Sequence, residues 1–396
     1  MAKKLRVGVL FGGRSGEHEI SLLSAASVFK AIDPDRYEVV PVGITKEGRW
    51  VTSADAERLL AGKPLEPERP LRAGDPKATP SAAVLAKGEA VVVPPEPQKS
   101  RTSLAPFETQ APARRLSDRA INVDIIFPVL HGTFGEDGTV QGLLELADIP
   151  YVGAGVLGSA AGMDKDIMKS LFKAAGLPIV KHVTILRSEW EAAPKKIEKL
   201  ILSKLKFPVF VKPANLGSSV GISKAHDQKE LLPAMAEAAK FDRKILVEEG
   251  VGGKKHKARE IECAVLGNDR PEASVAGEIV PSAEFYDYAA KYLDEGSALI
   301  IPAKLTKAES KTIQALAIAA FRAVDCSGLA RVDFLMDPQS GKIYLNEINT
   351  MPGFTSISMY PKLWAASGVP YPELIDRLIR LGMERNEQKR KNRYAR

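Results

Sequence analysis

The sequence is poor in cysteine and has no long apolar run, and both shortages narrow what the chain can be. Its only cysteines, Cys263 and Cys326, lie far apart, without CxxC spacing or a nearby histidine cluster. This argues against a structural zinc site and against a disulfide framework. No apolar stretch approaches the ~20 residues that span a bilayer, and no secretory signal precedes the first apolar run. We therefore expect a cytoplasmic protein with no membrane partner.

Net positive charge is also scarce outside residues 385–396, although the formal net charge of the chain is +7. That segment alone holds six basic residues against one acid, so the rest of the chain is nearly neutral. A short basic end is more often a solvated, frayed tail than a binding arm. Because no aromatic RNA-binding signature accompanies it, the sequence predicts no nucleic-acid partner.

At 396 residues the chain is long enough for two or three domains. An apolar run at 5–11 leads into two glycines and a helix-like segment at about 17–31. The pattern recurs where the run at 123–130 leads into a loop and a helix-like segment at 140–147. This alternation predicts an open parallel sheet flanked by helices, with ligands at the carboxyl ends of its strands.

Between these halves lies a proline-rich insertion, at about residues 54–118. Ten of the chain's 27 prolines fall between 61 and 112. Proline cannot donate to a strand ladder, so neither a long helix nor a central strand fits here. We predict an edge strand at 90–93 and no catalytic role for the insertion.

The pattern changes after about residue 159. A helix is predicted at 164–175, ended by Gly176, and short strands and hairpins then dominate through Glu278. A helix at 304–324 follows, and a last helix near 372–383 precedes the basic tail. The sequence therefore predicts an α+β arrangement for this half of the chain.

The most informative segment is a predicted hairpin of two strands, 329–336 and 342–348, joined by a turn at 337–341. Side chains two apart share a face, so Arg331 points with Asp333 and Glu347 with Asn349. Counting outward from the turn places Asp333 nearly opposite Glu347. A divalent cation such as Mg²⁺ bound to phosphates would explain two facing acids. When the hairpin is considered alone, a solvent-exposed pair of strands whose acids are neutralised by Arg331 explains these residues slightly better.

Other polar residues end strands or begin helices. Lys212 ends an apolar strand before a small-residue loop at 215–221, which could cradle phosphate or form an ordinary turn. Lys165 begins a helix, where unpaired amides favour anions, although such lysines are usually solvated. Further acids and a histidine could bind ligands or simply be capping or exposed residues, namely Glu17, His131, Glu248, Glu249 and Glu260.

Together these segments resemble the D-alanyl-D-alanine ligases of the ATP-grasp superfamily. The resemblance covers nearly the whole chain except the insertion and the basic tail, and several independent motifs occur in the same order. They lie at 12–21 (GGRSGEHEIS), 131–138 (HGTFGEDG), 163–165 (MDK), 211–213 (VKP), 217–221 (GSSVG), 285–288 (FYDY), 291–292 (KY), 331–333 (RVD) and 346–353 (NEINTMPG).

The resemblance implies a three-domain ATP-grasp architecture of α/β and α+β parts. Its segments would be an N-terminal domain at 1–158, a central subdomain at 159–250, a C-terminal subdomain at 251–384 and the tail at 385–396. ATP would lie between the last two domains, held by Lys165, Lys212, Gly217, Ser218, Ser219, Glu248, Glu249, Val251, Glu260 and Lys291. Two Mg²⁺ ions, with Mn²⁺ as an alternative, would be bound by Asp333, Glu347 and Asn349.

The resemblance also implies where two D-alanines bind and react. Glu17 would receive the ammonium group of the first, beside His131, with Ser218 and Tyr292 closing a loop over it. Arg331 and the amide of Gly353 would stabilise the oxyanion, while Asn349, Ser358 and Met359 complete the substrate site. ATP would activate the first carboxylate as an acyl phosphate, which the second amine attacks. A homodimer is expected from the same resemblance.

Two departures from the family pattern and two rival functions accompany this expectation. The segment 252–258 is longer than usual, which weakens the implied contacts at Val251 and Glu260, and Ala289 replaces a common acid of the closing loop.

One rival is a D-alanine–D-lactate ligase, against which Tyr292 argues, because such relatives have phenylalanine there or a differently built loop. The other is a non-catalytic nucleotide-binding protein.

Overall fold

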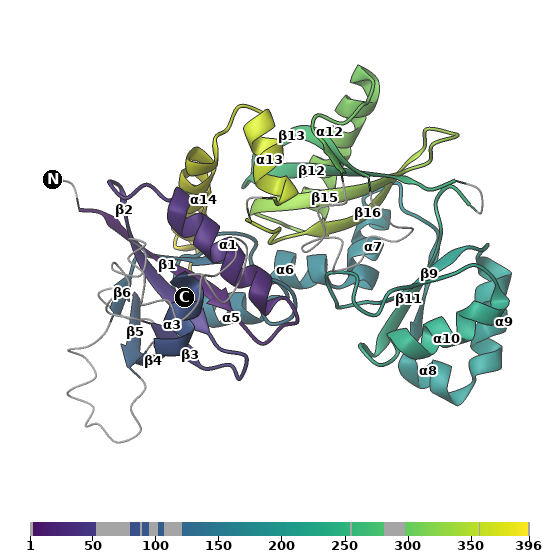
Figure 1. Cartoon of the computed structure of the whole chain (residues 1–396), viewed down its shortest axis with the longest axis horizontal. Coiled ribbons are helices and arrows are strands. Elements are labelled where there is room, and N and C mark those ends of the chain that lie inside the picture. The colour runs from purple at the N-terminus through teal and green to yellow at the C-terminus, as the bar shows by residue number, and fades with distance from the viewer. Residues whose placement is uncertain are drawn as a thin grey trace, which may run out of the picture.

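The computed structural model folds the chain into three sheets with helices packed against them (Figure 1). In Figure 1 the N-terminal sheet and the small sheet of residues 182–249 lie at opposite ends, and the C-terminal sheet lies between them. No helix among the described residues is both long and apolar enough to cross a membrane. The domain boundaries at 158, 250 and 384 remain predictions. The described residues are 3–52, 80–87, 89–94, 102–106, 121–253, 256–280, 298–355 and 357–394.

A parallel core carries the first half of the site. β1 pairs in parallel with β2 on one side and with β7 on the other, which confirms the predicted parallel sheet. The four residues of β7 and the last six of β1 are buried, as expected of strands covered on both faces. The elements are β1 (Leu5–Gly12), α1 (His18–Ala31), β2 (Tyr37–Ile44), β7 (Ile125–Pro128) and α5 (Thr139–Leu146).

The insertion extends this sheet with antiparallel strands, in the order β6-β5-β4-β3-β2-β1-β7. Since β4 lies between β3 and β5, the prediction of an edge strand at 90–93 was wrong. Proline does not interrupt β4 because Pro94 follows its end and Pro106 ends β5. The elements are β3 (Trp50–Thr52), α3 (Pro80–Lys87), β4 (Glu89–Val92), β5 (Thr102–Pro106) and β6 (Ile121–Val123).

The central sheet is antiparallel, in the order β10-β9-β11-β8, and three helices accompany it. The expectation that strands and hairpins dominate this segment missed those helices, although α10 buries Leu231, Ala234, Met235 and Ala238 at helical spacing. Pro233 inside α10 and Pro194 at the start of α9 obscured the pattern. The elements are β8 (His182–Leu186), α8 (Arg187–Ala192), α9 (Pro194–Lys204), β9 (Val209–Pro213), β10 (Ser223–Ala225), α10 (Gln228–Ala238) and β11 (Lys244–Glu249).

The C-terminal sheet is antiparallel too, in the order β14-β13-β12-β15-β16, and contains the predicted hairpin. Its core is formed by α12 and by α7, whose Met168 and Phe172 are fully buried. The predicted helices at 164–175 and 304–324 are confirmed as α7 and α12. The elements are α6 (Val156–Met163), α7 (Lys165–Ala174), β12 (Arg259–Gly267), β13 (Glu272–Val280), β14 (Ala298–Ile300), α12 (Lys307–Ala323), β15 (Gly328–Met336) and β16 (Ile343–Asn349).

Two further helices, α13 (Met359–Ala366) and α14 (Tyr371–Lys389), return the chain to the N-terminal sheet, where α14 packs beside α1 (Figure 1). The expectation of a frayed basic tail from residue 385 was wrong for its first part. The Arg385 guanidinium lies 4.0 Å from the centre of the Tyr151 ring, and Lys389 pairs with Glu145. The tail is held because acids and an aromatic ring of the N-terminal region face it.

Candidate functional site

A row of three carboxylates crosses the C-terminal sheet. Asp333 of β15 pairs with Glu347 of β16, as predicted, and with Glu262 of β12 on its other side. The hairpin register is not the ordinary one, because an irregularity between Asp333 and Phe334 adds one residue on β16 and so brings Glu347 opposite Asp333. Arg331 is opposite Asn349 in the same hairpin. Antiparallel pairing brings side chains of directly opposite residues within contact distance, so these acids face one cavity.

Arg331 neutralises part of this row. Its guanidinium donates two bonds of 2.7 Å to the Asp333 carboxylate and lies 3.0 Å from Glu262. The Asn349 amide donates to Asp333 over 3.0 Å. Among the described residues no three His, Cys, Asp or Glu side chains form a ready-made metal cage. The predicted metal set is therefore two carboxylates and an amide, of which Asp333 is held by Arg331.

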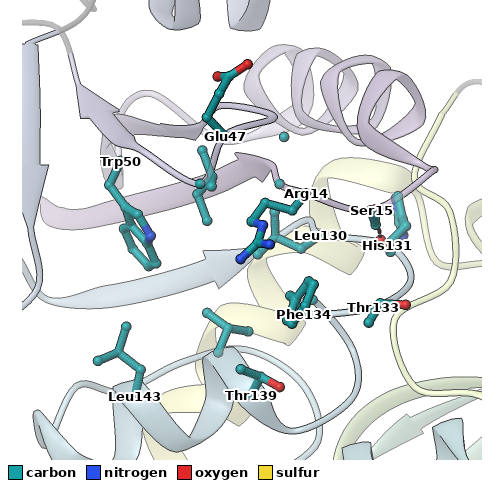
Figure 2. Close-up of a pocket in the computed structure, with 16 residues that line it drawn as sticks. Arg14, Ser15, Glu47, Trp50, Leu130, His131, Thr133, Phe134, Thr139 and Leu143 are labelled. Carbon is teal, nitrogen blue, oxygen red and sulfur yellow. Dashed lines mark hydrogen bonds between the residues drawn. The ribbon is translucent and has the colours of Figure 1, made fainter. Parts of the chain in front are cut away.

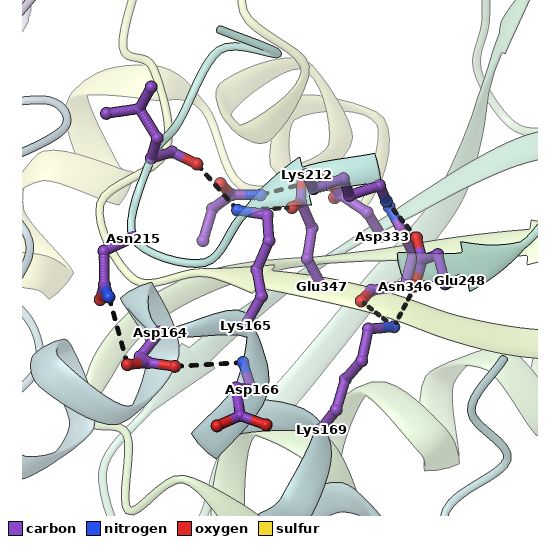
Figure 3. Close-up of polar contacts among 12 residues, drawn as sticks. Asp164, Lys165, Asp166, Lys169, Lys212, Asn215, Glu248, Asp333, Asn346 and Glu347 are labelled. Carbon is purple, nitrogen blue, oxygen red and sulfur yellow. Dashed lines mark hydrogen bonds and ion pairs between the residues drawn. The ribbon is translucent and has the colours of Figure 1, made fainter. Parts of the chain in front are cut away.

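Lysines from two other elements face the same row. Lys165, at the start of α7, lies 3.5 Å from Glu347 and donates to the carbonyl of Leu216 over 2.8 Å. One turn later Lys169 contacts Glu248, which also accepts a bond from Lys212 (Figure 3). Residues four apart lie on one helix face, so α7 presents both of its ammonium groups to the strands.

The buried carboxylate of Glu248 is ionised. Burial opposes the charge, but Lys169 and Lys212 outweigh it and lower the pKa of Glu248 to about 2. Burial likewise works against the ammonium of Lys212, whose pKa is nevertheless raised by Glu248 and Glu347. Cationic groups held this way beside a cavity suit a polyphosphate ligand.

That cavity has a volume of about 160 Å³ and opens between the central and C-terminal sheets. Apolar walls from Phe210, Ile222 and Phe334 face the charged groups, a combination typical of a cofactor site. The N–H of Glu249 already donates to the carbonyl of Lys181, so a ligand contact from this backbone unit would use its carbonyl. The predicted nucleotide and metal residues that line the cavity are Lys212, Ser219, Glu248, Glu249, Val251, Glu260, Asp333 and Glu347.

The loop between β9 and β10 has an unusual backbone. Ser218 and Ser219 both adopt left-handed conformations, with φ of 51° and 59°. Non-glycine residues rarely do so, and such strain clusters at ligand-binding segments. The loop brings Ser218 to Glu17, whose carboxylate accepts its hydroxyl bond. It thereby joins the central sheet to the N-terminal one.

The Glu17 carboxylate lies at the start of α1, 8% exposed and between two glycines. A Cβ at Gly132, where φ is +74°, would lie 2.7 Å from Glu17 Oε2, and one at Gly217 would lie 3.0 Å from it, so a side chain at either position would press on this carboxylate. The neighbouring Glu136 accepts a 2.8 Å bond from the N–H of Gly132. Burial, reinforced by the charge of Glu17, raises the pKa of Glu136 to about 8.

His131 is buried, with both ring nitrogens bonded to the protein. Nδ1 donates to the carbonyl of Met351 over 3.1 Å, so Nε2 accepts from Ser24 Oγ, also at 3.1 Å. Burial lowers the pKa of His131, which fits the neutral tautomer that these partners require. The ring therefore fixes the segment 351–354 against α1, and Phe354, packed edge-on to Phe127, fixes it further.

That segment contains the remaining predicted substrate residues. A Cβ at Gly353 would lie 2.8 Å from Ser358 Oγ, so the chain passes close to this hydroxyl. Ser358 Oγ accepts a 3.0 Å bond from the N–H of Thr355. Met359, which begins α13, is buried. Two other predicted residues, Lys291 and Tyr292, and the replacement at Ala289 lie outside the described residues.

A second cavity, of about 300 Å³, opens behind the loop that carries His131 (Figure 2). The side chain of Arg14 lies in it, 5.0 Å from the centre of the Phe134 ring, and Trp50 and Leu143 line it as well. Ser15 and His131 line this cavity as well, and Ser15 Oγ donates to the His131 carbonyl over 2.6 Å. No sequence prediction concerned this cavity.

Three residues of the site were missed by the sequence predictions. Glu136 lies in the motif at 131–138, Lys169 falls four residues after Lys165, and Glu262 falls two residues after Glu260. The helical and strand spacings placed Lys169 and Glu262 on the same faces as predicted residues, and that signal could have identified them.

Comparisons with known proteins agree on one family. The family model described as D-ala D-ala ligase N-terminus matches residues 6–154, and the one described as D-ala D-ala ligase C-terminus matches residues 171–380. A D-alanine–D-alanine ligase of Bacillus cytotoxicus is 47% identical over 392 residues, 99% of each chain. One of Heliobacterium modesticaldum is 48% identical over 390 residues, 98% of this chain and 97% of its own.

Solved structures of the same kind share the fold. The D-alanine–D-alanine ligase of Coxiella burnetii superposes with a TM-score of 0.80 at 36% identity, covering 98% of this chain and 97% of its own. The VanG D-Ala:D-Ser ligase of Enterococcus faecalis gives a TM-score of 0.78 at 36% identity, covering 96% of this chain and all of its own.

Proposed function

The chain belongs to the D-alanine–D-alanine ligase family, and from that premise we propose that it joins two D-alanines with the consumption of ATP. One observation carries the proposal. Glu17 of the N-terminal region, Ser218 of the central loop and the lysines facing the β15–β16 acids form adjoining parts of one site. The buried carboxyl of Glu136 interacts with Glu17, Lys165 and Glu347 together, so the two parts adjoin electrostatically.

The nucleotide would occupy the 160 Å³ cavity. Lys165 and Lys212 are the cations available to its phosphates, and the amides of the loop around Ser219 add donors. Glu248 and Glu260 supply carboxylates for the amino group of the purine and the hydroxyls of the ribose. We propose that Gly217, Ser218, Val251 and Lys291 complete the set.

Two Mg²⁺ ions, or Mn²⁺ in their place, would be held by Asp333, Glu347 and Asn349. The donors fit, because hard cations prefer carboxylate and amide oxygens and because Asp333 and Glu347 are paired across the hairpin. Such ions, when bound, neutralise the charge of a transferring phosphoryl group. Arg331 donates hydrogen bonds to Asp333 in this structure, and it would keep its ion pair with Glu262 if Asp333 bound a metal ion.

The first D-alanine would place its ammonium group on Glu17, beside Ser218. His131 orients this part of the site through Met351 and Ser24, with no proton to give at neutral pH. Bound ATP supplies the phosphoryl group that makes the first carboxylate electrophilic, as an acyl phosphate. Burial of Glu17 keeps its charge from being screened by water, so it can fix the ammonium firmly.

The second D-alanine would lie near Gly353, Ser358 and Met359, with its amine directed at the activated carbon. The Arg331 guanidinium and the Gly353 N–H would stabilise the tetrahedral oxyanion, and each such donor contributes ~3 kcal/mol in well-studied enzymes. We further propose that Tyr292 closes the site against water. The expectations of a homodimer and of a cytoplasmic location stay predictions.

A phosphate-release assay tests this function. Purified protein is given ATP and Mg²⁺ with D-alanine, L-alanine, D-alanine plus D-lactate, or D-alanine plus D-serine, and products are identified by mass spectrometry. We expect release that depends on D-alanine and a D-alanyl-D-alanine product. The D-serine arm is included because VanG, named a D-Ala:D-Ser ligase, has a similar structure. Absence of D-alanine-dependent release would refute the ligase, and a mixed product at neutral pH would favour a rival substrate.

A further inference from the structure

A buried cluster beneath the nucleotide cavity holds two lysines but only one carboxylate in direct contact with both. Lys169 Nζ lies 2.9 Å from Glu248 Oε2, and Lys212 bonds to the other carboxylate oxygen (Figure 3). The side chains of Lys169 and Glu248 are 1% and 2% exposed. Lys169 also donates to the carbonyl of Asn346 over 3.3 Å, which fixes its ammonium group from the side of β16.

One of these lysines is surplus to the charge of Glu248. A buried carboxylate is balanced by a single ammonium group, and burying a second is unfavourable unless it has another partner. Burial lowers the pKa of Lys169, and Glu248 opposes that shift. Glu347 also attracts both ammonium groups, and a negative ligand in the cavity would add a further partner for Lys212.

The two lysines differ in what they can reach. Lys212 lines the cavity, whereas Lys169 is not one of the described residues that form its wall. Lys169 lies on the inner face of α7, and within the described part of the chain its ammonium group makes its polar contacts with Glu248 and with the backbone of β16. A ligand in the cavity can thus draw Lys212 away from Glu248 but cannot displace Lys169.

We propose that Lys169 is a positioning residue that keeps Glu248 neutralised so that Lys212 can turn to the phosphates of the nucleotide. The inference rests on the proposed function, since it assumes that the cavity binds a nucleotide. Without Lys169, Lys212 is the one counter-ion in contact with Glu248 among the residues that the structure describes. Its departure would leave a buried carboxylate uncompensated, so Lys212 would stay where it is.

Calorimetric titrations with Mg·ADP and with adenosine test this in the whole protein. In Lys169→Met the affinity for Mg·ADP should fall about ten- to hundredfold, the effect expected for loss of a charge-assisted bond. Adenosine affinity should change less than about threefold, because Glu248 keeps its place. A merely structural loosening of the cavity would weaken both ligands alike.

A second variant makes the test sharper. Lys169→Met/Glu248→Gln has no carboxylate to retain Lys212, so its ratio of Mg·ADP affinity to adenosine affinity should recover most of what Lys169→Met loses. The ratio is compared because loss of the proposed contact between Glu248 and the nucleoside would weaken both ligands alike. The matched control is Lys244→Met, which removes a similarly buried lysine of β11 whose ammonium pairs with Asp164 and Asp166. It should lower the melting temperature without a selective loss of Mg·ADP.

The outcomes separate the two proposals. If wild type and Lys169→Met bind Mg·ADP equally well, or if the affinity ratio of the double variant is no better than that of the single one, the role of Lys169 alone is overturned. A wild-type protein that binds no Mg·ADP overturns the nucleotide site and this inference with it. If Lys169→Met does not fold, the double variant decides, because its cluster holds one ammonium group and no carboxylate, and its ratio of Mg·ADP affinity to adenosine affinity must be near that of wild type.

Discussion

We predict that Glu136 makes the stability of this protein depend on pH near neutrality. Its carboxyl is 9% exposed, lies beside Glu17 and accepts one bond from the N–H of Gly132. Burial and the neighbouring charge raise its pKa from the model-peptide value of 4.5 to about 8. Glu136→Gln keeps the shape and the oxygen that accepts from Gly132 but cannot ionise, so it isolates the cost of that charge.

The sign follows from the raised pKa. The folded state holds the Glu136 proton more tightly than the unfolded state, so its stabilising effect is complete below pH 4.5 and is lost as the pH rises toward 8. At pH 7 the lost stability is about 3 kcal/mol, from roughly 1.4 kcal/mol per pH unit above the unfolded pKa. Glu136→Gln should therefore be more stable than wild type at pH 8 and nearly equal at pH 4.5.

Urea unfolding of both proteins between pH 4.5 and 9, followed by tryptophan fluorescence, measures the difference. Glu191→Gln, which removes a charge from an exposed position of α8, serves as the control and should follow wild type at every pH. A difference between Glu136→Gln and wild type that does not grow from pH 4.5 to 8 would refute the reasoning. So would a variant less stable than wild type at pH 8.

Three further predictions concern other parts of the site and the tail. Glu347→Gln should abolish D-alanine-dependent phosphate release while circular dichroism and the melting temperature stay near wild type, and near-normal turnover would contradict the metal assignment. Gly217→Ala should raise the KM for D-alanine at least tenfold, since its Cβ would approach Glu17 to 3.0 Å, whereas an unchanged KM would contradict the ammonium site. Arg385→Met should lower the free energy of unfolding by about 1 kcal/mol through loss of its stacking on Tyr151, measured against Arg393→Met.

The sequence by itself determined the local parts of the site. The period of two along a strand sufficed to put Arg331 on one face with Asp333 and Glu347 on one face with Asn349. Regular counting from the turn would place Asp333 opposite Asn346, so its pairing with Glu347 depends on the irregularity between Asp333 and Phe334, which the sequence did not show. The parallel core could also be predicted from the sequence, because apolar runs that are each followed by a helix are compatible with few other topologies. The strand at 89–92 was misplaced because the partner of a short strand is chosen by the packing of distant segments.

Tertiary structure decided how the parts combine. The bond between Ser218 and Glu17 joins residues 201 positions apart, and no spacing in the sequence encodes that distance. The same holds for Lys169 against Glu248, an ion pair that exists only because α7 packs beneath β11 and β16. The periodicity of a sequence predicts which face of a helix or strand a residue occupies. The charge balance of a buried site depends instead on which helix and strand faces pack together, and only the folded chain determines that.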